Sequence, residues 1–295
     1  MKGEISLSLT TSRMRFLLTR RGLSLFIAEA LVFFGIISGC LQIAFALWPS
    51  SITNGIWLLA VSVAMSAFIA AVKVSPGDRV THTIPHPNVT ISVCRGDLLT
   101  EDAHLIIGFT DTFDTDPTDG IVISPSSVQG QFQSRFYANA LSHLDSDLVC
   151  ALQDQEIVSL ERRESKARGK LDRYQIGTVA TLNLSGKRVF CVAYGRMGND
   201  FMVRSDVDTL WISLSRTWEA VRHHGDLQPV AIPVIGSEMA RVTALSRESL
   251  LKMIILSFVA HSRQQLVTRS LSVVIHPKDF TDFDMLEIRS FLHSL

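Results

Sequence analysis

Hydrophobic side chains gather in two long stretches near the start of this 295-residue chain. Residues 23–47 contain one charged side chain, Glu29, and residues 52–72 contain none. The short connector Trp48-Pro49-Ser50-Ser51 separates the two stretches. A helix needs about 20 apolar residues to cross the hydrocarbon core of a bilayer. The pattern therefore predicts a transmembrane hairpin over residues 23–74, with helices at 23–47 and 52–72.

Beyond the second stretch the apolar runs become short and regularly spaced. Ser75-Pro76-Gly77-Asp78 breaks the second helix, so residues 75–88 are interpreted as a linker. Alternating or short apolar runs then predict strands at 89–94, 104–109, 175–184, 187–194, 229–235 and 270–275. Apolar positions three and four apart predict helices at 131–152, 206–223, 247–266 and 282–295. Strands alternating with helices indicate a three-layer α/β domain over residues 89–295.

Basic residues lie on one side of both apolar stretches. Four arginines lie within residues 13–21, Lys73 and Arg79 follow the second stretch, and the connector contains no Lys or Arg. By the positive-inside rule, both termini are expected in the cytoplasm, with residues 1–22 as a cytoplasmic N-terminal segment. The first stretch is too long for a cleaved signal peptide and lacks a small-residue cleavage site, so both helices are expected to be retained.

Glu29 is unusual in an apolar stretch, because a charge at the centre of a membrane helix costs roughly 2.5–3.5 kcal/mol. Two interpretations stay open. Glu29 lies close enough to the cytoplasmic face to reach polar headgroups or to become protonated, or it faces the interior of a bundle of protomers. Small residues such as Gly35 and Ala64 would let helices pack closely, which is compatible with a homo-oligomer.

Charge and cysteine content limit the possible functions. Lys and Arg together number 28, as do Asp and Glu, so the balance gives no reason to expect nucleic-acid binding. The four cysteines have no metal-ligand spacing and are expected to be reduced thiols. The chain contains no GxSxG, HExxH, P-loop or GxGxxG motif. We therefore predict no catalytic residue, no metal and no tightly bound cofactor.

Two motifs resemble those of the macro domain, the ADP-ribose-binding fold. The first, VCRGDLLTEDAHLIIG (residues 93–108), is similar to the family's strand, Gly-Asp turn and second strand. The second, AIPVIGSEMARV (residues 231–242), is similar to its late strand and small-residue loop. The resemblance covers about residues 89–280 and implies a three-layer macro-domain fold with a mixed sheet.

The combination of a macro domain with two preceding spans resembles the transmembrane macro-domain effector of Thoeris, a bacterial antiphage system. The resemblance implies a two-pass protein of the cell inner membrane with a cytoplasmic macro domain. Its signal would be an ADP-ribose derivative, with an amino-acid conjugate as one candidate, made by a TIR-domain partner. Binding of that signal would promote oligomerisation and membrane disruption, and so abortive infection. A membrane-tethered ADP-ribosyl hydrolase is the alternative.

The resemblance also implies a set of ligand-binding residues: Asp97, Leu98, Thr110, Asp111, Ser126, Ser127, Gly130, Gly236, Ser237, Glu238, Met239, Ala240 and Arg241. Asp97 would accept a hydrogen bond from the adenine amine, because an ionised carboxylate is only an acceptor; alternatively it caps a short helix. The amides after Gly236 would hold the diphosphate. Arg241 either adds a charged contact or is a solvated loop residue. Residues 126–130 either bind phosphate or form a simple loop.

One loop departs from the family pattern. Typical macro domains have Asn-Ala-Ala-Asn and a glycine-rich run after the second strand, whereas this chain has Gly108-Phe109-Thr110-Asp111 followed by Asp114, Asp116 and Asp119. The missing asparagine favours binding over hydrolysis. Two interpretations of the acidic loop stay open: it holds a cationic group of a modified ADP-ribose, or it is simply solvated.

Overall fold

The computed structural model describes residues 20–47, 55–74, 77–138, 140–184, 186–236 and 245–295. Two units are described separately: a helical hairpin that ends before residue 78, and an α/β domain that begins there.

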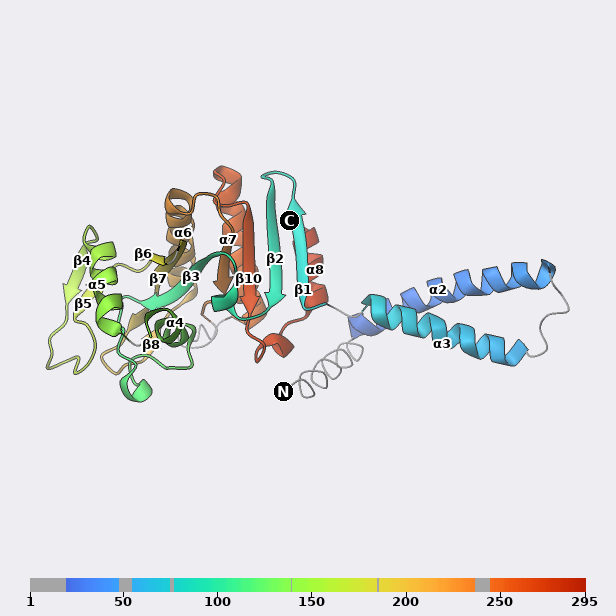
Figure 1. Ribbon diagram of the computed structural model, residues 1–295, viewed down its shortest axis with the longest axis horizontal. Helices are drawn as coiled ribbons and strands as arrows, with labels where there is room; N and C mark the ends of the chain where they lie inside the picture. The colour runs from blue at the N-terminus through green and yellow to red at the C-terminus, as the bar shows by residue number, and fades with distance from the viewer. Residues whose placement is uncertain (1–19, 48–54, 75–76, 139, 185, 237–244) are drawn as a thin grey trace. The chain divides into compact units, whose positions relative to one another are not determined.

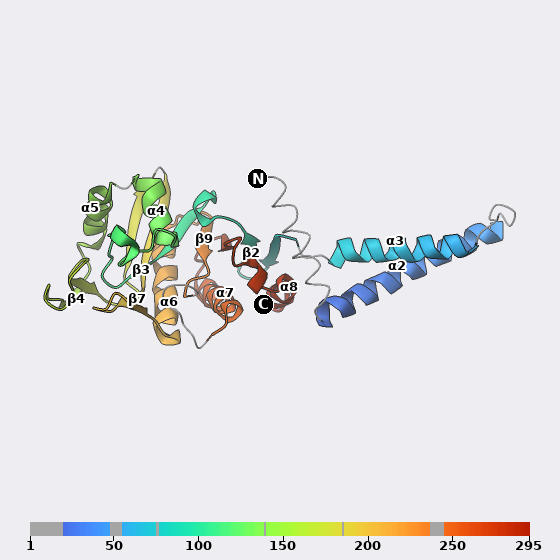
Figure 2. The ribbon, with the colours of Figure 1, turned by 90° about the horizontal axis from the view of Figure 1, so that it is seen from below.

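Two helices form the hairpin, α2 (Arg20–Leu47) and α3 (Gly55–Val74) (Figure 1). Within them, Leu23–Ala44 and Gly55–Val74 are long and apolar enough to cross a membrane, judged by length and composition. The two helices lie side by side in Figures 1 and 2. The residues predicted to connect them lie outside the described part of the chain.

Glu29 of α2 pairs with Lys73 of α3 within the same chain, at 2.9 Å between Oε2 and Nζ. Lys73 also lies 5.3 Å from the centre of the Phe33 ring. Glu29 therefore has a partner within its own chain, the basic residue at the end of the second helix, which the sequence analysis did not consider.

The buried face of α3 repeats every four residues, with Ser62, Ser66, Ala70 and Val74 on it. The hydroxyls of Ser62 and Ser66 donate to the carbonyls of Leu58 and Ser62, at 2.7 and 2.6 Å. Because these hydrogen bonds stay within the helix, small size rather than polar contact explains this face.

A mixed sheet forms the centre of the α/β domain, in the order β1-β2-β10-β9-β3-β7-β6 (Figure 1). Five neighbouring strands are parallel: β2 (Val89–Arg95), β10 (Ser270–Ile275), β9 (Val230–Pro233), β3 (His104–Thr110) and β7 (Lys187–Met197). Antiparallel strands flank them: β1 (Arg79–Ile84), β6 (Val179–Leu184) and the short β8 (Val203–Arg204). β2 and β3 are almost wholly buried, as expected of parallel strands covered on both faces.

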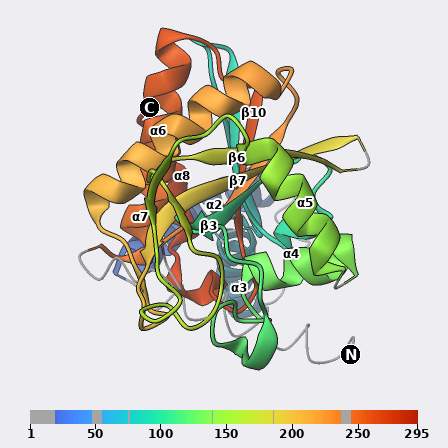
Figure 3. The ribbon, with the colours of Figure 1, turned by 90° about the vertical axis from the view of Figure 1, so that its left-hand side faces the viewer.

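Helices cover both faces of this sheet (Figure 3). On one side lie α4 (Val128–Tyr137) and α5 (Leu141–Leu152), and on the other α6 (Val207–His224) and α7 (Arg247–Gln264). The last helix is α8 (Met285–His293). Among the described residues, short 3-10 helices occupy three loops: η2 (Leu98–Thr100), η3 (Thr118–Gly120) and η4 (Phe280–Asp282). The predicted three-layer α/β fold with a mixed sheet is confirmed.

Three details differ from the sequence prediction. The helix predicted over 131–152 is two helices, because Ala138 takes a left-handed conformation (φ 48°) at the end of α4. Part of the predicted linker 75–88 is strand β1, whose residues pair antiparallel with β2 from Arg79–Cys94 to Ile84–Val89. Strands β4 (Ile157–Leu160) and β5 (Asp172–Tyr174) form a separate two-stranded sheet that was not predicted. We call residues 157–174 the arm.

Candidate functional site

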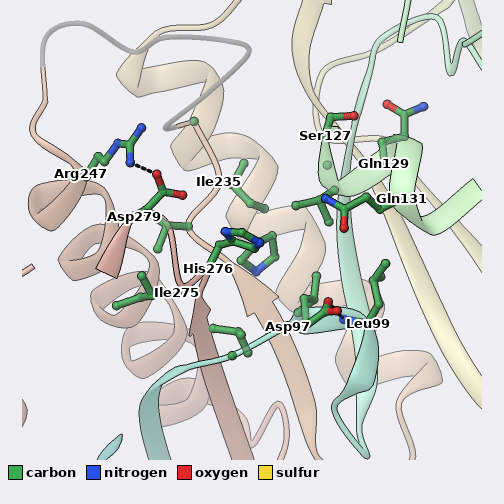
Figure 4. A pocket seen from close by; sticks show the side chains of 18 of the residues that line it. Asp97, Leu99, Ser127, Gln129, Gln131, Ile235, Arg247, Ile275, His276 and Asp279 are labelled. Atoms are coloured by element: carbon green, nitrogen blue, oxygen red, sulfur yellow. Dashed lines mark hydrogen bonds and ion pairs between the residues drawn. The ribbon is translucent and has the colours of Figure 1, made fainter. Parts of the chain in front are cut away.

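A pocket of about 110 Å³ lies at the carboxyl ends of the parallel strands (Figure 4). Residues 96–99 after β2, 234–236 after β9 and His276 after β10 line it, and the first turn of α4 completes it. In open α/β sheets this edge is where ligands bind, because loops and helix N-termini converge there. The topology therefore explains why the site lies here.

Ser127 starts α4 at the wall of the pocket. Its hydroxyl accepts from the amide of Gly130 at 3.0 Å and donates to the carbonyl of Ser124 at 2.6 Å. Gly130 has no room for a side chain, since a Cβ would lie 2.3 Å from the Ser124 oxygen. Gly130 thus packs behind the pocket, while Ser127 lines it. The N-terminal end of a helix favours anions.

Gly236 also lines the pocket and has φ of 87°, a left-handed conformation that glycine adopts most readily. The predicted binding residues that follow it, Ser237, Glu238, Met239, Ala240 and Arg241, lie outside the described residues. The role assigned to the loop as a whole stays a prediction.

Asp97 lines the pocket and has two partners of its own. One carboxylate oxygen accepts from the amide of Leu99 at 3.0 Å and so caps η2. The other pairs with Arg135 of α4 at 2.7 Å. Leu98 beside it is buried and also lines the pocket. The capping role is therefore present, and a carboxylate has enough lone pairs to accept a further hydrogen bond.

Thr110 and Asp111, by contrast, do not line the pocket. Asp111 is buried and accepts from Arg173 Nη1 and from the amide of Met197, both at 2.8 Å. Arg173 in turn donates to Glu161 at 2.6 Å. The carboxylate that the sequence offered to a ligand thus holds the arm to the loop after β3.

Two further aspartates of the acidic loop, Asp114 and Asp119, also pair with basic residues of the arm. Asp114 and Lys166 are both fully buried and form a 2.9 Å ion pair. Asp114 also accepts from the amide of Lys170, and Asp119 pairs with Arg168 at 3.2 Å. Both interpretations of this loop are therefore wrong for Asp114. It is not solvated, and the cation beside it belongs to the arm rather than to a ligand.

Ser126, another predicted ligand residue, is exposed outside the pocket lining, where its hydroxyl lies 2.9 Å from that of Ser124. Its neighbour Gln131 does line the pocket and donates to the Ser126 carbonyl at 2.8 Å. The helix predicted to start at residue 131 begins at Val128, and the sequence did not show which side chains of the preceding loop turn inward.

Several lining residues were missed by the sequence analysis. Gln129 donates to the Asp114 carbonyl at 2.7 Å. His276 accepts at Nδ1 from the amide of Lys278 at 3.3 Å, which leaves an N–H donor at Nε2 in the neutral ring. Arg247 and Asp279 form an ion pair across one side (Figure 4). His276 follows β10 directly, so the rule that ligands meet strand ends could have found it.

The thiols near the sheet are poorly suited to nucleophilic chemistry. Burial raises the pKa of Cys94 and of Cys191. A raised thiol pKa lowers the population of the reactive thiolate at neutral pH. Among the described residues no group of His, Cys, Asp and Glu is arranged to hold a metal ion. The pocket offers hydrogen-bonding groups and backbone amides for binding.

A model of the macro domain of the Thoeris protein ThsA matches residues 91–276. The chain belongs to this family. The matched region runs from β2 to His276, so it contains each strand whose end forms the pocket. It contains neither the hairpin nor β1.

Solved structures similar to this ThsA-family chain include forms of the Oceanobacillus iheyensis macrodomain. One mutant form is 13% identical with a TM-score of 0.48, over 73% of this chain and 94% of its own. The macrodomain with ADP is 11% identical with a TM-score of 0.41, over 74% and 98%. Another mutant form, with ADPR, is 12% identical with a TM-score of 0.40, over 74% and 100%. A search of curated proteins finds no match.

Proposed function

We propose that this protein is a membrane-anchored effector of bacterial antiphage defence. Its macro domain binds an ADP-ribose-derived signal made by a TIR-domain partner, and binding promotes oligomerisation of the chain and disruption of the inner membrane. One observation carries the proposal: a ThsA-type macro domain with a pocket at its strand ends is joined in one chain to two helices that are apolar enough to span a membrane.

The pocket suits a nucleotide with two kinds of group. Asp97 supplies an acceptor for an exocyclic amine at the end of β2. The Gly236 turn and the first turn of α4 flank the other part of the pocket, where backbone amides stabilise a diphosphate. Phe283, which is largely buried, adds an aromatic surface to the lining.

The hairpin is the output of the proposed mechanism. A ligand shifts the equilibrium toward an assembled state only by binding that state more tightly than the unassembled one. Both termini and the macro domain lie in the cytoplasm in this proposal, where the nucleotide is made.

The test is nucleotide binding and toxicity of the full chain carrying Gly236→Glu. A carboxylate at this wall repels a diphosphate and strains a left-handed turn, so we expect affinity for ADP-ribose to fall at least tenfold, equivalent to about 1.4 kcal/mol. Gly186→Glu is the matched control. Gly186 is also left-handed (φ 82°), yet a Cβ there meets no atom within 4 Å.

We expect cells that produce the TIR partner to survive phage-induced toxicity with Gly236→Glu but not with Gly186→Glu. Equal toxicity of the two variants would contradict nucleotide gating. Release of ADP-ribose from a modified protein by the purified chain would support the hydrolase alternative instead.

A further inference from the structure

The arm presents an apolar strand edge to solvent. Strand β4 pairs only with β5, so its other edge is open in the part of the chain that the structure describes. Ile157, Val158 and Leu160 are 49%, 62% and 69% exposed. Proteins normally protect such edges with charges or cover them, because an open edge pairs readily with another strand. Three of the four residues of β4 are apolar, and all four are exposed.

The arm is also held firmly in place. The buried Asp114–Lys166 pair and the Asp111–Arg173 pair fix its base to the loop after β3. The amide of Tyr174 donates to the Asp111 carbonyl at 2.8 Å. The exposed edge of β4 is therefore a fixed surface of the domain.

We propose that β4 is a self-association surface, on which the β4 strands of two copies of this chain pair antiparallel about a two-fold axis at Ser159. This register sets Val158 of each copy opposite Leu160 of the other. It also sets Glu156 opposite Arg162, so both ends of the pairing carry opposite charges. Glu156 and Arg162 are exposed, and neither forms an ion pair with another described residue. The surface is thus complementary to itself.

The charges beside β4 favour a second copy as the occupant, because Glu156 and Arg162 complement each other across the two-fold axis. The chain passes from α3 into the sheet at β1, which is one edge strand. The arm lies at the other end of the α/β domain, beyond β7 and β6 (Figures 1 and 2). Within the α/β domain, the strand therefore lies at the end opposite β1.

Strand β4 has four residues and a bulge between Ile157 and Ser159, so the pairing is short and weak in solution. Confinement of two chains to one membrane raises their effective concentration, which makes a weak contact sufficient. The inference rests on the proposed function in one respect, namely that assembly of the chain is the response to nucleotide binding. Measuring ligand affinity on the same variants separates self-association through β4 from nucleotide binding by the pocket.

Disulfide crosslinking of the full chain in membranes tests the register. In a background with Cys40→Ser and Cys150→Ser, Ser159→Cys places two thiols directly opposite each other, within the 7 Å Cα separation that a disulfide needs. Asp154→Cys is the control, because its two thiols lie about ten residues, roughly 33 Å, apart in this register. We expect at least about fivefold more dimer with Ser159→Cys than with Asp154→Cys. Equal crosslinking would overturn the register.

Exchanging the charges of Glu156 and Arg162 tests whether a second copy or a lipid surface contacts β4. In the Ser159→Cys background, Glu156→Arg or Arg162→Glu alone sets like charges opposite each other and should lower the dimer yield. The double variant restores opposite charges and should restore the yield. If the surface instead contacts anionic lipid, Glu156→Arg alone would increase contact and the double variant would rescue nothing. Unchanged ADP-ribose binding by all variants would show that the pocket is intact. Crosslinking through Ser159→Cys by a chain that binds no ADP-ribose derivative, even without the charge changes, would count against the proposed function alone.

Discussion

The loops after β2 and β3 begin alike and end in different environments. Each leaves a buried parallel strand, and each carries an aspartate, Asp97 or Asp111, that the sequence offers to a ligand. The side chain of Asp97 is 35% exposed beside the pocket, whereas that of Asp111 is 6% exposed under Arg173. The comparison shows that a strand end marks a possible site, and that the segment covering the loop decides whether the site is available.

The largest effect is expected where the arm covers the second loop. Lys166→Ala leaves Asp114 as an unpaired buried charge and should destabilise the domain by about 3–5 kcal/mol. Arg168→Ala, which breaks the exposed pair with Asp119 between the same two segments, should cost less than about 1 kcal/mol. Urea unfolding in detergent, followed through the buried Trp218, measures both. Similar costs would mean that the arm is not anchored by the buried pair.

The two aspartates should separate binding from stability. Asp111→Ala leaves Arg173 without its buried partner and should lower stability by about 3 kcal/mol. Asp97→Ala removes a helix cap and an exposed pair, which costs about 1 kcal/mol, but it should lower ADP-ribose affinity at least about tenfold. Titration calorimetry of the folded variants provides the comparison. A larger loss of ADP-ribose affinity with Asp111→Ala than with Asp97→Ala would contradict the assignment of Asp97 to the pocket and of Asp111 to the arm.

Two neighbouring serines test where the lining of the pocket ends, because Ser127 belongs to it and Ser126 does not. Ser127→Ala removes the cap of α4 and should cost about 1 kcal/mol, with weaker nucleotide binding. Ser126→Ala, at an exposed position outside the lining, should change stability by less than about 0.5 kcal/mol and leave affinity unchanged. Titration calorimetry measures the nucleotide affinity of both variants, and thermal unfolding measures their stability.

The smallest effect is a dependence of arm docking on pH. The hydrogen bond from Arg173 holds the pKa of Glu161 below its ordinary value of 4.5. A lowered folded pKa means that the stabilisation is present above pH 4.5 and is lost as pH falls through the lowered value. Amide exchange in residues 157–174 should therefore speed up in that acidic range. Glu161→Gln should remove this part of the pH dependence, and an unchanged profile would assign it to another group.

Short-range patterns were sufficient for six strands of the main sheet (β2, β3, β6, β7, β9 and β10) and for part of the pocket. β2, β3 and β10 are apolar enough to be found directly, and the Gly-Asp turn and Gly236 follow strand ends, where ligand sites are expected. The break at Ala138 was not predictable, because alanine favours helix, yet Ala138 takes a left-handed conformation. β1 was hidden by its short alternating pattern beside a helix breaker.

The fate of the acidic loop could not be predicted from local sequence. Asp111 and Arg173 are 62 residues apart, and Asp114 and Lys166 are 52 apart. Nothing in either segment alone specifies that they meet. A run of alternating charges such as residues 161–168 is typical of a solvated surface, yet Lys166 within it is fully buried.

The Glu29–Lys73 pair has a consequence for the order of events in a cell. Each apolar span contains one charged side chain, and the two neutralise each other within one chain. A hairpin that balances its own charge needs no neighbour in order to enter a bilayer. In the proposed mechanism, a single copy can therefore be made and inserted without committing it to a lethal complex, and dormant chains can accumulate before an infection begins.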